Sequence, residues 1–229
     1  MGKKIYNDID LLGKQFRYKR RRMVAKILNL ESGRRDAVLN AALKEFVLQG
    51  YDNASTNVIA KEAGISKALM FHYVSNKQEL FLVVYDYFSD LMKREYFDLM
   101  NYDEKDIFDK LRQSYFLQIK LSEKYPFIFD FNKLSRTTNS NEVNKELENR
   151  MREQHLSCYP KLFDGIDETK FRKGLNIEKC KQFIFWSNIG FTNQILEKIR
   201  NSEKSYMDCE SIMSELDEYF EELRKIFYA

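Results

Sequence analysis

Residues 55–80, STNVIAKEAGISKALMFHYVSNKQEL, contain the start signal of one helix, its stop signal and the start signal of a second helix within a few positions. Ser55 or Thr56 suits an N-cap, because its side-chain oxygen accepts a hydrogen bond from a free backbone N–H. Gly64 favours the end of that first helix, since a residue without Cβ adopts the left-handed conformation at no steric cost. These start and stop signals at this spacing are typical of a helix-turn-helix.

The second helix of this motif is predicted over residues 67–73, with Ser66 as its cap. A three-residue turn matches the spacing that holds two helices at a steep angle. In such motifs the second helix enters the major groove, which makes double-stranded DNA the expected partner. Ser75 and Gln78 fit a capping box, so a third helix is expected to begin near residues 76–77.

The run AKEAGISKALMFHYVSNKQEL, with the preceding RRDAVLNAALKEFVLQGYDNAST, resembles the N-terminal domain of the tetracycline-repressor (TetR) family of bacterial regulators. The matching positions are Gly50, Tyr51, Thr56, Ala60 to Gly64, Ser66, Lys67, Phe71 to Tyr73 and Lys77. Leu69 and Val74 depart from the small polar residue and the aromatic residue that are common there. The resemblance implies an all-α fold, with an N-terminal three-helix helix-turn-helix DNA-binding domain and a C-terminal helical ligand-binding and dimerisation domain.

Resemblance and position near helix starts predict eight DNA-contacting residues: Thr56, Ser66, Lys67, Ala68, Leu69, His72, Tyr73 and Lys77. Lys67 and His72 can donate hydrogen bonds to bases, whereas Ala68 and Leu69 suit a thymine methyl group. Tyr73 and Lys77 resemble the family's phosphate contacts, and Lys77 supplies a point charge there. Free N–H groups at the two helix starts can also point at phosphate oxygens.

Length and composition favour a helical chain of two domains. The 229 residues suffice for one small and one medium domain, and only two prolines with eight glycines favour long helices. We expect a basic N-terminal extension over residues 1–33, the DNA-binding domain over 34–80, and a helical effector-binding and dimerisation domain over 81–229. Helices are expected near residues 80–101, 103–122, 125–134, 141–163, 177–200 and 207–228.

Charge is distributed unevenly along the chain. Residues 1–77 hold 15 Lys and Arg against 7 Asp and Glu, a net +8, while residues 78–229 hold 23 against 28, a net −5. The basic part carries the motif, so affinity for DNA is expected to fall steeply with salt. Two interpretations of residues 1–33 stay open: an arm that enters a minor groove, or a solvated tail. Met23 is an alternative start site.

Other function classes are disfavoured by what the sequence lacks. No apolar run approaches the roughly eighteen residues that span a bilayer, so a cytoplasmic location is expected. Cys158, Cys180 and Cys209 suit reduced thiols better than a disulfide framework. His155 and Cys158 alone are too few for a metal site, and neither a nucleophile constellation nor a glycine-rich phosphate loop appears. We therefore expect no enzyme activity, no metal and no cofactor.

The chain holds 18 Phe and 14 Tyr, most of them after residue 70. Such side chains either wall a cavity for a hydrophobic small-molecule effector or pack as core, and both interpretations stay open. The candidate effector-pocket residues are Phe88, Met92, Tyr115, Phe116, Phe127, His155, Tyr159, Phe183 and Trp186.

The two closing helices carry the homodimer hypothesis. Gly190 follows Trp186 by one turn and permits close backbone approach, and an apolar stripe follows on the last helix. The expected interface, half of a four-helix bundle, comprises Trp186, Gly190, Ile212, Leu216, Phe220 and Leu223. A two-fold dimer reads a palindromic operator whose halves are about 34 to 36 Å apart, or a multiple of that.

Together these expectations predict a homodimeric transcription factor, a repressor released from its operator by a small hydrophobic effector. The alternative is a DNA-organising or cell-division protein of the same fold without a small-molecule inducer. Weak discrimination among operators and no response to ligands would favour that alternative.

Overall fold

The structure, a computed structural model, describes residue 27 and residues 30–138, 140–154, 162–201 and 209–229. Helices make up the regular structure of this part, and an isolated bridge joins Phe171 to Tyr228. The expected all-α fold is confirmed. None of the described helices is both long enough and apolar enough to cross a membrane.

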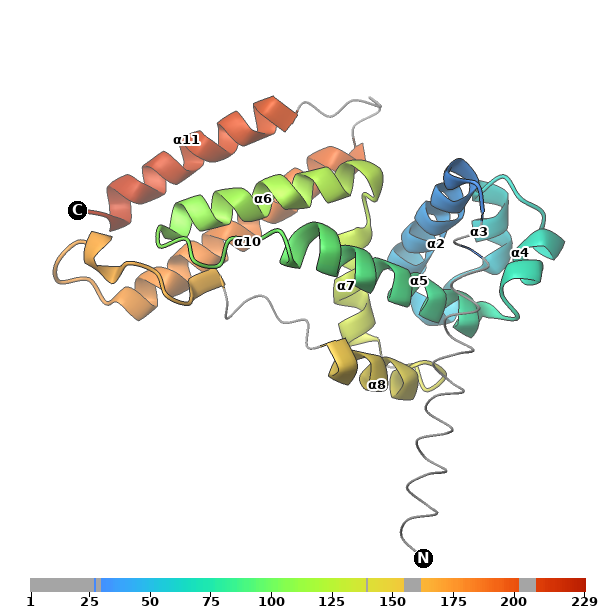
Figure 1. Cartoon of the computed structure of the whole chain (residues 1–229). Helices are drawn as coiled ribbons and strands as arrows, with labels where there is room; N and C mark the ends of the chain where they lie inside the picture. Colours follow the sequence, from blue (N-terminus) through green and yellow to red (C-terminus); the bar gives the residue numbers. More distant parts are fainter. Residues whose placement is uncertain (1–26, 28–29, 139, 155–161, 202–208) are drawn as a thin grey trace, which may run out of the picture. The chain divides into compact units, whose positions relative to one another are not determined.

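The chain divides into two compact units (Figure 1). Unit 1 comprises Met1–Asp90 and Phe127–Gln154, and unit 2 comprises Leu91–Pro126 and His155–Ala229. The helices of unit 1 are α2 (Ser32–Asn53), α3 (Thr56–Glu62), α4 (Lys67–Tyr73), α5 (Lys77–Met92, whose last two residues belong to unit 2), α7 (Ile128–Thr137) and α8 (Asn144–Gln154). Those of unit 2 are α6 (Ile107–Lys124), α10 (Ile177–Asn201) and α11 (Cys209–Phe227), with a π-turn at Lys93–Phe97 and a 3-10 turn at Glu168–Lys170.

The expected domain boundary at residue 80 stays a prediction, but the two compact units divide the chain at other positions. Helices α7 and α8 lie within residues 81–229 and nevertheless belong to unit 1. The reason is an aromatic core: Phe131 of α7 lies 5.2 Å from Phe81 of α5, and Phe81 lies 4.9 Å from Phe46 of α2, measured between ring centroids. All three rings are buried, so α7 completes the core beneath the helix-turn-helix.

Several element boundaries differ from expectation. Helix α5 ends at Met92, and the π-turn that follows reaches only Phe97, not residue 101. Its capping box is Asn76 with Glu79, one residue later than expected: the Asn76 Oδ1 accepts the Glu79 N–H at 2.8 Å, and the Glu79 carboxylate accepts the Ser75 N–H. Helix α6 begins at Ile107 because Asp106 caps it.

Helices α6, α10 and α11 lie side by side in unit 2 (Figure 1). Tyr115 of α6 is buried between them. Its hydroxyl donates to the Asn188 backbone carbonyl at 2.8 Å and lies 2.9 Å from the Thr192 hydroxyl on α10. Its ring meets Phe191 of α10 and Phe220 of α11 edge-on, at centroid distances of 5.7 and 6.0 Å. One aromatic side chain thus ties the three helices together.

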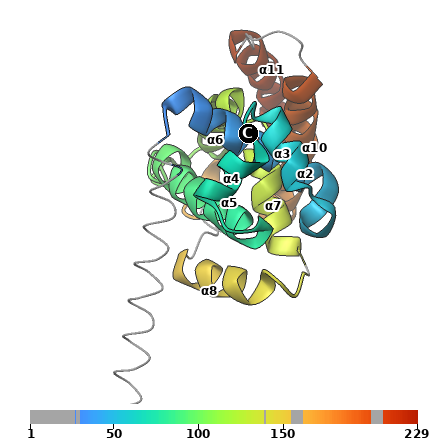
Figure 2. The same cartoon turned by 90° about the vertical axis from the view of Figure 1, so that its right-hand side faces the viewer.

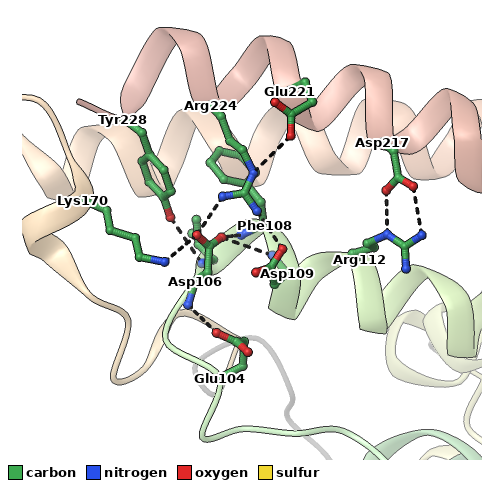
Figure 3. A network of polar contacts seen from close by, with 11 residues as sticks. Glu104, Asp106, Phe108, Asp109, Arg112, Lys170, Asp217, Glu221, Arg224 and Tyr228 are labelled. Carbon is green, nitrogen blue, oxygen red and sulfur yellow. Dashed lines mark hydrogen bonds and ion pairs between the residues drawn. The ribbon is translucent and has the colours of Figure 1, made fainter.

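A buried carboxylate joins the start of α6 to the end of α11 (Figure 3). The Asp106 Oδ1 accepts the N–H groups of Phe108 at 2.9 Å and Asp109 at 3.2 Å. Its Oδ2 accepts from Lys170 at 2.8 Å and Arg224 at 2.7 Å. Asp106 is 3% exposed, so both cations neutralise a charge that burial alone would disfavour.

Candidate DNA-binding surface

The predicted helix-turn-helix is confirmed in its boundaries and in the cap of its second helix. Helices α3 and α4 begin at Thr56 and at Lys67, as the sequence indicated. Gly64 has a φ of 66°, the left-handed conformation that ends α3 and starts the turn. The Ser66 hydroxyl then accepts the Leu69 N–H at 3.1 Å and caps α4.

Helix α4 buries one face and offers the other to solvent. Met70 and Val74 are 1% and 2% exposed, so they anchor the helix to unit 1. Elsewhere on α4, Lys67, Ala68 and His72 are exposed, and Leu69 and Tyr73 are half-buried. Thr56, at the start of α3, is also half-buried. Figure 2 views unit 1 with α3 and α4 toward the reader. A helix of this kind can enter a groove without losing its own packing.

The Lys77 side chain is held in place by the end of α2. Its Nζ donates to the Asp52 backbone carbonyl at 2.7 Å and lies 4.8 Å from the centroid of the Tyr51 ring. Gly50, with a φ of 72°, interrupts α2 just before Tyr51 and lets that ring turn into the core. Within the part of the chain that the structure describes, this contact uses one of the three ammonium N–H groups, and the other two can donate to a phosphate.

Sequence reasoning missed Glu45, which sets the start of α3. Glu45 lies on α2, is 8% exposed, and its carboxylate accepts the Ser55 N–H at 2.8 Å. The Ser55 side chain, the expected N-cap, makes no capping hydrogen bond in the structure. An acidic residue on one helix that caps the next leaves no local signal, because the pairing depends on how the helices pack.

The candidate effector-pocket residues divide by burial. Phe88, Met92 and Tyr115 are buried, Phe127 is half-buried, and Phe116, Phe183 and Trp186 are exposed. His155 and Tyr159 lie outside the described residues. The set stays a prediction, although exposure at three positions favours a surface role there over the wall of an enclosed cavity.

The expected dimer residues divide in the same way. Ile212, Leu216, Phe220 and Leu223 are buried within the chain, because α11 packs this stripe on α6 and α10. Each of them is at most 8% exposed, which leaves little area for a second copy, and their place in a dimer interface stays a prediction. Trp186 and Gly190 of α10 are exposed, and with Phe183 and Ile189 they form an apolar surface, the α10 stripe. Sequence reasoning missed Ile189.

Comparison with known proteins gives a match between residues 38–84 and the family described as bacterial regulatory proteins, tetR family. This match shows that the chain carries a DNA-binding domain of the TetR family. The chain is 23% identical over 154 residues, 65% of this chain and 76% of the relative, to the fatty acid metabolism regulator protein of Bacillus subtilis. The matched domain over residues 38–84 makes this chain a DNA-binding transcriptional regulator.

Solved structures of TetR-family fold agree with the architecture. The ketosteroid transcriptional regulator KstR2 of Mycobacterium tuberculosis is 17% identical, with a TM-score of 0.57 over 88% of this chain and 97% of that one. AibR, solved in complex with isovaleryl coenzyme A and operator DNA, is 17% identical, with a TM-score of 0.50 over 79% of this chain and 94% of that one. At this identity the similarity establishes the fold.

Proposed function

We propose that this chain is a homodimeric repressor that leaves a palindromic operator when a small hydrophobic effector binds. The observation that carries the proposal is the two-faced α4, with Met70 and Val74 buried and Lys67, Ala68 and His72 exposed at a capped helix start. Base edges in the major groove offer the acceptors that a lysine and a histidine can recognise.

Within this proposal, phosphate contacts position the protein and base contacts select the sequence. Lys77, Tyr73 and the free N–H groups at the start of α3 contact phosphates, and Lys67 and His72 contact bases. The excess of basic residues in the first third of the chain adds sequence-independent attraction to DNA.

The second copy docks on the α10 stripe. Phe183, Trp186 and Ile189 are 49%, 59% and 42% exposed and follow one another at three-residue spacing along one helix. Exposed apolar side chains gathered in this way mark an interaction surface. Gly190, beside them, has no atom within 4 Å of the position that a Cβ would take, so a partner backbone has room to approach.

The effector is a fatty acid or its acyl-CoA thioester, bound in unit 2. Two similarities support this class: a relative named as a regulator of fatty acid metabolism, and a protein of the same fold whose structure holds isovaleryl coenzyme A with operator DNA. A coupling of about 1 to 3 kcal/mol between effector and operator is enough for a useful switch.

A fluorescence-anisotropy titration of DNA from the region around the chain's own gene tests the proposal. We expect saturable binding that is tighter than to a shuffled duplex, and a loss of affinity on addition of acyl-CoA thioesters of increasing chain length. Equal affinity for both duplexes, with no response to any thioester, favours a DNA-organising protein instead. No binding to either duplex at low salt refutes both functions.

A further inference from the structure

A single residue between α7 and α8 holds two parts of unit 1 that border Lys77. The Glu142 carboxylate accepts a hydrogen bond from the Tyr51 hydroxyl at 2.5 Å, and its backbone carbonyl accepts one from the Gln78 side chain. Tyr51 lies at the end of α2 and Gln78 in the first turn of α5. Glu142 therefore contacts Gln78, which follows Lys77 in sequence, and Tyr51, whose ring lies against the Lys77 ammonium.

Tyr51 is the donor in this contact. Burial, the hydrogen bond to Glu142 and the nearby negative charge raise the pKa of the Tyr51 hydroxyl, so it keeps its proton at neutral pH. The ring is 2% exposed and lies 5.2 Å from Phe81 between centroids. The Lys77 ammonium lies over the same ring, 4.8 Å from its centroid.

The segment that carries Glu142 is anchored independently of that contact. Val143 and Leu147 are buried, and Arg150 of α8 pairs with Asp86 of α5 at 3.1 Å and with Glu146 at 2.5 Å. The Arg150 and Asp86 side chains are 12% and 5% exposed, so this is a partly buried pair with little freedom. Glu142 is thus presented from a fixed support.

We propose that Glu142 is a positioning residue for DNA binding: through Tyr51 and Gln78 it fixes the start of α5 and the Lys77 ammonium in the orientation that contacts phosphate. The proposal rests on the function proposed above, because it assigns Lys77 to the DNA backbone. Glu142 itself touches no DNA in this account.

Positioning and simple electrostatics make opposite predictions for Glu142. A carboxylate near the phosphate contact repels DNA, so if charge alone mattered, removal of Glu142 would strengthen binding. If Glu142 orients Lys77, its removal leaves the Tyr51 hydroxyl without its acceptor and weakens binding. The sign of the change in affinity therefore separates the two roles.

The test measures the affinity of the full chain for a labelled duplex from the region around its own gene, and for a shuffled duplex, as a function of salt. We expect Glu142→Ala to weaken binding to both duplexes by roughly three- to tenfold, because one charge-assisted hydrogen bond is lost at a partly solvated site. We also expect the slope of log affinity against log salt to become shallower by about one, the contribution of one phosphate contact. Glu142→Gln, which keeps an acceptor oxygen, restores most of the affinity.

Glu148→Ala is the matched control, since it removes an exposed carboxylate from the same segment and keeps the pairs of Arg150 with Asp86 and Glu146. Tyr51→Phe deletes only the hydroxyl donor and is expected to show the same loss of DNA affinity. This variant still tests the proposal if Glu142→Ala fails to fold. Unchanged or tighter binding by Glu142→Ala or Tyr51→Phe, or an equal loss in Glu148→Ala, overturns the proposal. If Lys77→Ala binds normally, the assignment of Lys77 to phosphate fails as well, whereas a loss in Lys77→Ala alone refutes only the role of Glu142.

Discussion

Replacement of Asp106 by Asn gives a quantitative test of how unit 2 is held together. Burial disfavours the charged carboxylate, but hydrogen bonds from Arg224 and Lys170 outweigh burial and lower the pKa of Asp106 from 3.8 to about 2. One pKa unit corresponds to about 1.4 kcal/mol, so the ionised carboxylate stabilises the folded unit by about 2 kcal/mol at neutral pH. The exposed part of Lys170 makes this an upper value.

The pH dependence follows from the direction of the shift in pKa. Because the pKa of Asp106 is lower in the folded chain than in the unfolded chain, the contribution is complete above about pH 4 and disappears as the pH falls to about 2. Asp106→Asn keeps a side chain that can cap α6 but removes the charge. We therefore expect the variant to lose about 2 kcal/mol of unfolding free energy at pH 7, and to match the unaltered protein near pH 2.

Urea unfolding followed by circular dichroism from pH 7 to pH 2 measures this difference, and hydrogen exchange at pH 7 locates the loss in α6 and α11. Asp217→Asn is the control, because the Arg112 and Asp217 side chains are 49% and 44% exposed and their pair is worth less than about 1 kcal/mol. A difference for Asp106→Asn that stays below that of the control at pH 7, or that persists at pH 2, would refute the reasoning.

Three further predictions concern DNA and assembly. Lys77→Ala should weaken binding to all sequences and reduce the salt slope by about one, measured by anisotropy, whereas a sequence-selective loss would contradict a phosphate contact. His72→Ala should change preference at one or two base pairs by about 1 to 3 kcal/mol in a binding-site selection, and an equal loss on random DNA would reject its role. Trp186→Glu should convert the proposed homodimer to a monomer in light scattering and remove preference for a palindrome. Dimers that survive this charge would exclude the α10 stripe.

Much of the DNA-binding surface was predictable because its signals are local. The Ser66 hydroxyl caps a helix by accepting the N–H of Leu69, three residues later, and Gly64 ends a helix through its own backbone angle. Such features act within one turn of chain, so residue order alone reports them. The capping box at the start of α5 was misplaced by one residue, because Ser75, Asn76, Gln78 and Glu79 offer two overlapping pairs and only the geometry selects one.

The apolar stripe on α11 shows where such prediction stops. Its periodicity indicated a buried face, but it did not indicate what buries that face, and the stripe packs on α6 and α10 of the same chain. The exposed α10 stripe had no distinct pattern of its own, since aromatic residues occur on both faces of that helix. A hydrophobic face in sequence is therefore compatible with a core or with an interface.

The sequence by itself determined the helix-turn-helix, its boundaries and the basic character of the chain that surrounds it. Only the tertiary structure decided that α7 and α8 complete unit 1, and that Glu142 meets Tyr51 and Arg224 meets Asp106 across separations of 91 and 118 residues. The physical reason is that caps and turns are satisfied within a few residues. A buried charge or a distant hydrogen bond finds its partner only after the helices have packed.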